Sequence, residues 1–171
     1  MKYGTSGLLA LALVAPAALH TAQALVTERT LSVDAAREAA VAAREQCRRD
    51  GQRVTVTVLD HAGRTRVMLR DDGARPHTVE HSLRKAYTAL TYRQPSAEYG
   101  KRATSRPTGA GALHLEKITT AGGGLPIFAG KEVVGAIGIS GSPAAEGQPG
   151  GVRDEACAQA GIDRIAKGLG G

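Results

Sequence analysis

The stretch "TTAGGGLPIFAGKEVVGAIGIS", residues 119–140, decides the fold, because it sets six glycines around two short apolar runs. The runs, Leu125–Phe128 and Val133–Ser140, flank a four-residue link that contains glycine, which predicts a β-hairpin. Gly135 and Gly138 lie inside the second run, where a missing side chain lets another backbone or helix approach closely. The stretch is therefore expected to be structural.

Three chemical motifs rich in glycine do not fit this stretch. A P-loop ending at Gly130 would need glycine where the chain has Leu125, and a dinucleotide fingerprint would need its third glycine at Ile127. A nucleophile elbow centred on Ser140 would need glycine at position 142, which is Ser142. Phosphate-cradling and serine-hydrolase chemistry are thus not indicated.

The first 24 residues have the composition of a secretory signal. Lys2 provides a positive start, Leu8–Leu19 an apolar run, and Ala22-Gln23-Ala24 a small-residue cleavage site. The apolar run is short for a bilayer, and no later run is longer, so no membrane span is expected. We predict an exported protein, periplasmic or extracellular, whose mature domain covers residues 25–171.

The composition of the chain limits its partners. Aromatic residues are only 3% of the sequence, so aliphatic side chains must fill the core. The formal net charge is +6, but the basic residues alternate with acids and form no aromatic-and-basic stripe, so no nucleic-acid partner is expected. A basic surface suits an anionic small molecule.

The two cysteines allow two interpretations. Cys47 follows a small-residue stripe at Ala36, Ala40 and Ala43, and Cys157 shares a helix face with glycine and alanine. Two such faces could pack closely enough for a disulfide, which an oxidising compartment would preserve. Two separate buried thiols fit the pattern equally well, and both alternatives stay open here.

The remaining pattern predicts a small α/β (α+β) domain with an antiparallel meander rather than a doubly wound sheet. Alternating valines predict a half-buried first strand. Ser32 is expected to cap the first helix. The expected elements are helices over 33–49, 76–92, 96–104 and 154–167, strands over 52–60 and 64–70, the glycine hairpin, and an irregular or weakly helical segment over 105–120.

His77 and His81 are the histidines with informative spacing, four apart in the second predicted helix, so both rings can face one point. The apolar positions from Val79 to Leu90 predict a core stripe on the opposite side of that helix. The pair should therefore look away from the core, to the surface or between subunits. A solvated polar face is the plain alternative. Thr78 replaces the glutamate of a zincin motif, and no c-type haem motif exists.

Three longer stretches carry a resemblance to a known family. They are "LDHAGRTRVMLRDDGARPHTVEHSLRKAYTALTYRQPSAEYGKR", "GGGLPIFAGKEVVGAIGISGSP" and "DEACAQAGIDRI". Together they resemble the GlcG/HbpS family from about residue 31 to 165. The strongest parts are Arg70-x-Asp72-Gly73-Ala74, the helix around Lys85, and the triple glycine.

The resemblance implies a profilin-like antiparallel sheet flanked by helices, and homo-oligomers, often octamers. Exported members are associated with haem binding and haem-linked oxidative-stress sensing. In members like the haem-binding one, a Pro-Thr pair lies near the haem, which makes Thr108, after Pro107, a candidate contact.

Our first functional hypothesis is an exported haem-binding protein. His77 and His81 would bind the iron as neutral imidazoles, and Arg75, Arg84 or Lys85 would pair with the propionates. The alternative is an enzyme or binding protein for a small anionic metabolite, glycolate- or corrinoid-related. Since no catalytic motif is present, a non-enzymatic binding protein is favoured; a scaffold for a surface receptor is a third hypothesis.

Overall fold

The computed structural model describes residues 24–105, 107–144 and 146–170, without the side chains of residues 107–110. The predicted signal lies outside these residues, apart from Ala24. The chain forms one four-stranded antiparallel sheet in the order β2-β1-β4-β3. The elements are α1 (Val33–Arg49), β1 (Thr55–Asp60), β2 (Thr65–Arg70), α2 (Thr78–Tyr92), α3 (Ser96–Thr104), the 3-10 helix η1 (Pro107–His114), β3 (Gly124–Ala129), β4 (Glu132–Ser140) and α4 (Val152–Leu169).

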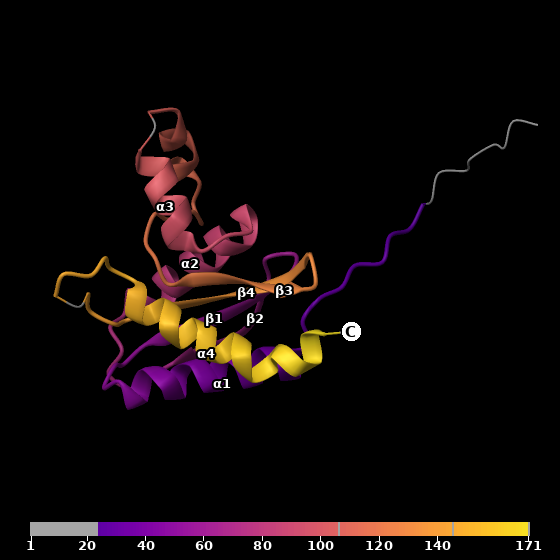
Figure 1. Cartoon of the computed structure of the whole chain (residues 1–171), viewed down its shortest axis with the longest axis horizontal. Coiled ribbons are helices and arrows are strands. Elements are labelled where there is room, and N and C mark those ends of the chain that lie inside the picture. The colour runs from indigo at the N-terminus through magenta and orange to yellow at the C-terminus, as the bar shows by residue number, and fades with distance from the viewer. Residues whose placement is uncertain (1–23, 106, 145, 171) are drawn as a thin grey trace, which may run out of the picture.

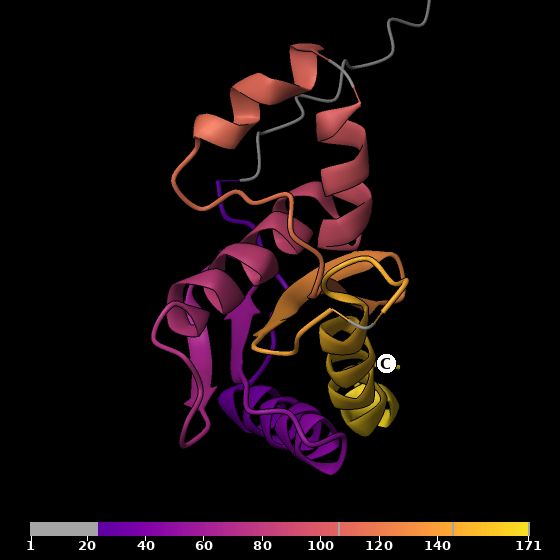
Figure 2. The same cartoon turned by 90° about the vertical axis from the view of Figure 1, so that its left-hand side faces the viewer.

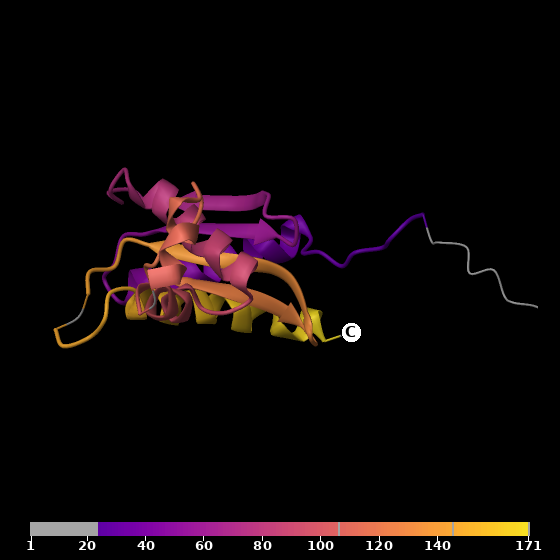
Figure 3. The same ribbon diagram turned by 90° about the horizontal axis from the view of Figure 1, so that it is seen from above.

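The sheet separates two helical layers. α1 and α4 pack against each other on one face, and α2 covers β1, β4 and β3 on the other (Figures 1 and 2). α3 and η1 form a small lobe beside α2. Seen from above, the hairpins β1–β2 and β3–β4 lie side by side and join through β1 and β4 (Figure 3). The expected meander is thus two joined hairpins, and the predicted profilin-like class is confirmed.

A disulfide joins α1 and α4, the two helices that cover the face of the sheet opposite α2. α1 starts where Ser32 accepts a hydrogen bond from the Ala35 amide, as predicted. The buried stripe of α1 is alanine-rich and ends in Cys47, so α4 can approach closely. Cys47 and Cys157 are bonded, with Cα atoms 5.5 Å apart, which resolves the alternatives in favour of the bridge.

The expectation of a half-buried β1 is wrong, because both faces of the strand are covered. Val56 and Val58 face the core under α1 and α4. Thr55 and Thr57 are also fully buried, since α2 lies over them. Their hydroxyls form hydrogen bonds with polar groups of α2. The alternation of valine and threonine therefore distinguishes two buried faces of the strand, an apolar one and a hydrogen-bonded one, rather than a buried face and an exposed one.

The predicted core stripe of α2 is only partly right, because polar residues share the buried face. The helix buries Thr78, Ser82 and Lys85 against the sheet, together with small alanines. Thr78 Oγ1 lies 2.7 Å from Thr55 Oγ1, and Ser82 Oγ lies 2.7 Å from Thr57 Oγ1. Because these polar positions pair with one another, the interface on this side of the sheet is partly hydrogen-bonded. Of the apolar positions that begin at Val79, Ala86 is fully buried, whereas Val79, Leu83 and Leu90 lie at the partly buried margin.

The glycine hairpin forms as predicted. Gly130 occupies its turn with φ +65°. A Cβ at Gly138 would overlap the backbone of α2 at Ser82 and Ala86, so the absent side chain is what lets the helix lie on the strand. Within the described part of the chain no helix is long and apolar enough to cross a membrane.

Candidate ligand-binding site

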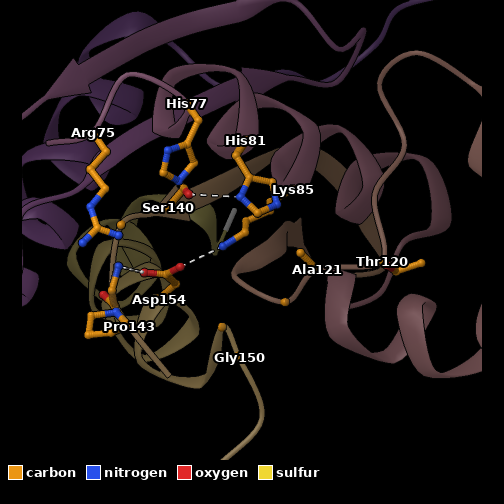
Figure 4. A pocket seen from close by; sticks show the side chains of 14 residues that line it. Arg75, His77, His81, Lys85, Thr120, Ala121, Ser140, Pro143, Gly150 and Asp154 are labelled. Atoms are coloured by element: carbon orange, nitrogen blue, oxygen red, sulfur yellow. Dashed lines mark hydrogen bonds and ion pairs between the residues drawn. The ribbon is translucent and has the colours of Figure 1, made fainter. Parts of the chain in front are cut away.

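A cavity of about 410 Å³ opens where α2 begins, β4 ends and α4 begins. Its wall comes from four segments: the start of α2 with its preceding loop, the residues ahead of the triple glycine, the loop after β4, and the first turn of α4 (Figure 4). Arg75, His77, His81 and Lys85 bring basic groups to it, and Asp154 is its acidic group. The sheet topology brings together residues far apart in the sequence.

Lys85 and Asp154 form a buried ion pair on this wall. Their side chains are 5% and 2% exposed, and Lys85 Nζ lies 2.8 Å from Asp154 Oδ2. Lys85 also donates to the carbonyl of Ile139 at 2.9 Å, and Asp154 Oδ1 accepts the Ser142 amide at 3.1 Å. The pair therefore ties α2 to α4 and to the end of β4.

His81 lies half-buried beside this pair and lines the open cavity; the sequence predicted that its ring would look away from the core. Its Nδ1 is 3.3 Å from Ser140 Oγ on β4 (Figure 4). Burial lowers the pKa of His81, and the positive charge of Lys85 lowers it further. The imidazole is thus neutral near pH 7. When Nδ1 carries the proton and donates to Ser140, Nε2 has a free lone pair.

His77 lies one turn earlier and is exposed, its ring centroid 6.5 Å from that of His81. The two rings also line a shallower hollow of about 210 Å³, together with Glu80 and Arg84. Arg84 is ion-paired with Glu80 at 2.7 Å. The histidine pair thus separates the larger cavity from the shallower one.

The structure brings together only some of the predicted ligand-binding residues. Arg75, His77, His81 and Lys85 share the cavity, whereas Arg84 belongs to the hollow on the other side. Thr108 lies in η1, and its side chain is outside the described residues.

Sequence reasoning missed Asp154, Ser140 and the loop after β4 as parts of this site. Asp154 reads as an ordinary acid in the first turn of a helix, and Ser140 as the end of a strand. Only the sheet register, which brings the end of β4 beside α2, places them near His81 and Lys85. The glycine-rich composition of the loop was the one available signal.

Glu155 of α4 holds the triple glycine by a hydrogen bond. Its Oε1 accepts the Gly123 amide at 3.2 Å. Burial raises the pKa of Glu155, although the bonds from backbone amides oppose that effect. Across residues 24–105, 107–144 and 146–170, no three His, Cys, Asp or Glu side chains group as metal ligands. Any metal bound among these residues would have at most two protein ligands of these types.

The fold and this cavity define a class: a profilin-like domain with a pocket at one end of its sheet whose ionisable groups are mostly basic. Residues 31–163 match the family described as "Haem degrading protein HbpS-like". The chain belongs to that family, which confirms the resemblance found in the sequence.

Solved structures agree with this assignment. HbpS of Streptomyces reticuli, as a double mutant, is 36% identical with a TM-score of 0.73, covering 86% of this chain and 97% of that one. The protein ORFY of Klebsiella pneumoniae is 25% identical with a TM-score of 0.73, covering 85% and 97%. A structure titled "PduOC:Heme Complex" is 26% identical with a TM-score of 0.68, covering 80% and 95%.

A curated relative is also similar. A protein of Citrobacter freundii, described as an uncharacterized 15.0 kDa protein in the dhaT-dhaS intergenic region, is 33% identical over 114 residues. That match covers 66% of this chain and 80% of the relative.

Proposed function

We propose that this chain is an exported haem-binding protein whose iron ligand is His81, with His77 as the second imidazole. The observation that carries the proposal is His81 itself: a half-buried imidazole of lowered pKa, beside a cavity, with one ring nitrogen next to Ser140. Metal-ligating histidines commonly donate their other ring N–H to a neighbouring acceptor, which fixes tautomer and orientation. Membership of the HbpS-like family and the likeness to a haem complex support the ligand.

The residues present fit iron better than they fit a whole porphyrin ring. The cavity volume lies in the range of small-molecule sites, roughly 300–1,000 Å³. Polar and apolar atoms share its wall about equally, but charged side chains, histidines and glycines make up most of its lining, and Ala121 and Pro143 are among its few apolar side chains. A flat macrocycle would therefore rest against the histidines at the mouth, where a second subunit can cover it. Bound haem would supply an iron centre able to take an imidazole ligand.

We propose a homo-oligomer because a second subunit would cover a haem at the mouth of the cavity. The resemblance implies octamers, which we take as the expected form. The side of β2 that carries Arg66, Met68 and Arg70 is exposed, because α2 lies over the other three strands. Light scattering on the mature protein after gel filtration measures the mass directly, and a monomer would exclude the assembly.

Export is proposed from the leader-like residues 1–24, and the disulfide supports it, since such bonds persist in oxidising compartments. A role in haem-linked oxidative-stress sensing would follow from haem capture outside the cytoplasm. N-terminal sequencing of the protein recovered from a periplasmic or culture fraction tests the predicted cleavage after Ala24.

The test of haem binding is a titration of the ligand-free protein followed by Soret absorbance. We expect saturation at a fixed stoichiometry, and an affinity at least tenfold weaker in His81→Ala. His77→Ala should have the smaller effect, because that ring is exposed. His114→Ala is the matched control, since His114 is exposed on η1 and lines none of the cavities described above. Equal Soret titrations in all four proteins would remove the histidine pair from the site.

A further inference from the structure

The ammonium group of Lys85 has one hydrogen bond left to make. A lysine has three N–H donors. Two of them reach the Ile139 carbonyl and Asp154, and no acceptor for the third is found among the described residues. The side chain is 95% buried and lines the cavity, so a group bound in the cavity can reach this donor. An acceptor that enters the cavity can complete the set.

Gly123 packs closely against the Lys85–Asp154 ion pair. Its φ is +117°, and a Cβ there would lie 2.8 Å from Lys85 Nζ and 2.9 Å from Asp154 Cβ. Any side chain at this position would press on the ion pair from the side of the triple glycine. The glycine therefore allows the backbone to lie directly against the ammonium group.

Arg75 supplies the spare positive charge of the cavity. Lys85 and Asp154 neutralise each other, and His81 is held neutral. Arg75 is exposed, lines the same cavity, and has no carboxylate within ion-pair distance among the residues described. Its guanidinium points toward the loop that carries Pro143 (Figure 4). A free guanidinium in such a place matches a carboxylate in bidentate geometry.

We propose that this cavity is a carboxylate-binding site, with Arg75 and the third N–H of Lys85 as its charged donors. The inference goes beyond iron binding and does not depend on it, because neither donor is an iron ligand. The carboxylate can come from two sources: a free small organic acid, or a propionate of haem whose ring stays at the mouth. Both present the same group to the same donors.

The experiment has two arms on the oxidised, ligand-free protein. The first is calorimetric titration with succinate at pH 7. The second compares the binding of haem with that of haem dimethyl ester, in which both propionates are blocked. Each arm is run on wild type, on Arg75→Gln, and on Arg37→Gln as a matched control, since Arg37 is exposed on α1 and lines none of the cavities described above. Arg75 is exposed, so its substitution should leave folding intact.

The outcomes separate the sources. Succinate binding that weakens at least tenfold in Arg75→Gln but not in Arg37→Gln indicates a free acid. An ester that binds at least tenfold more weakly than haem, with the difference lost in Arg75→Gln alone, indicates a propionate. No succinate heat together with equal binding of haem and ester would overturn the proposal, as would equal losses in the two arginine variants. If succinate binds but haem does not, the proposed haem-binding function is refuted, whereas the proposed carboxylate-binding site is supported.

Discussion

The buried pair of Lys85 and Asp154 makes a sharp prediction about stability. Asp154→Ala leaves the ammonium buried with a single protein acceptor, the carbonyl of Ile139. Removing one partner of a buried ion pair costs about 3–5 kcal/mol. The Ser142 amide also loses its acceptor, which adds up to about 1–3 kcal/mol if water cannot replace it. We expect the free energy of unfolding to fall by about 4–8 kcal/mol when both terms apply in full.

The measurement is urea unfolding at pH 7 followed by circular dichroism, with the disulfide intact. The matched variant is the double substitution Lys85→Met with Asp154→Leu, which removes both charges. Replacing a buried pair by apolar residues of similar volume is often neutral, so this protein should keep only the cost of the unpaired Ser142 amide and unfold about 1–3 kcal/mol below wild type. If Asp154→Ala costs less than about 1 kcal/mol, or the double variant is as unstable as the single one, the pair is not buried as described.

Three other outcomes are expected. Replacing Cys47 and Cys157 together by alanine should lower the free energy of unfolding by about 4–5 kcal/mol in the chain-entropy account, because the bridge closes a loop of 110 residues; an unchanged urea midpoint would contradict this. Gly138→Ala should cost at least about 1–3 kcal/mol by forcing α2 off β4, whereas unchanged thermal unfolding would show that the helix can shift freely. Haem affinity should hold from pH 8 down to about 6.5, the ordinary histidine pKa, and decline only below it, because the folded pKa of His81 is lowered; a decline centred above pH 7 would exclude a neutral His81 as ligand.

The same residue makes stability depend on pH. A histidine whose pKa is lowered by folding stays neutral while the unfolded chain takes up a proton. Its contribution is therefore intact above about pH 6.5 and is lost as the pH falls through the lowered value. Glu155 acts in the opposite sense, because folding raises its pKa. Its contribution to stability is present at low pH and is lost as the pH rises through the raised pKa.

The sequence was sufficient to predict elements whose patterns are local. The cap at Ser32, the bounds of α3 and the glycine hairpin depend on neighbouring residues, and the structure confirms them. The two errors share one cause. Apolar periodicity identifies the apolar face of an element. It does not reveal a polar face that is buried because its hydroxyl groups form hydrogen bonds with a neighbouring element, as on β1 and α2.

The cavity was the least predictable feature, for a related reason. His81 and Lys85 could be singled out on one helix, and the basic character of the site was anticipated. Ser140 and Asp154 follow them by more than fifty residues, and their relation depends on β4 lying next to β1. Without that strand order, the partner that holds Lys85 inside the protein could not be identified.

The covalent link between the first and last helices has a practical consequence for handling the protein. Every backbone bond from Cys47 to Cys157 lies within the closed ring, including the whole α3–η1 lobe. A single proteolytic cut in that lobe would leave two pieces still joined, migrating as one band until a reductant is added. Apparent integrity on a non-reducing gel would then hide a broken chain, and only mass spectrometry or a reduced sample would reveal the nick.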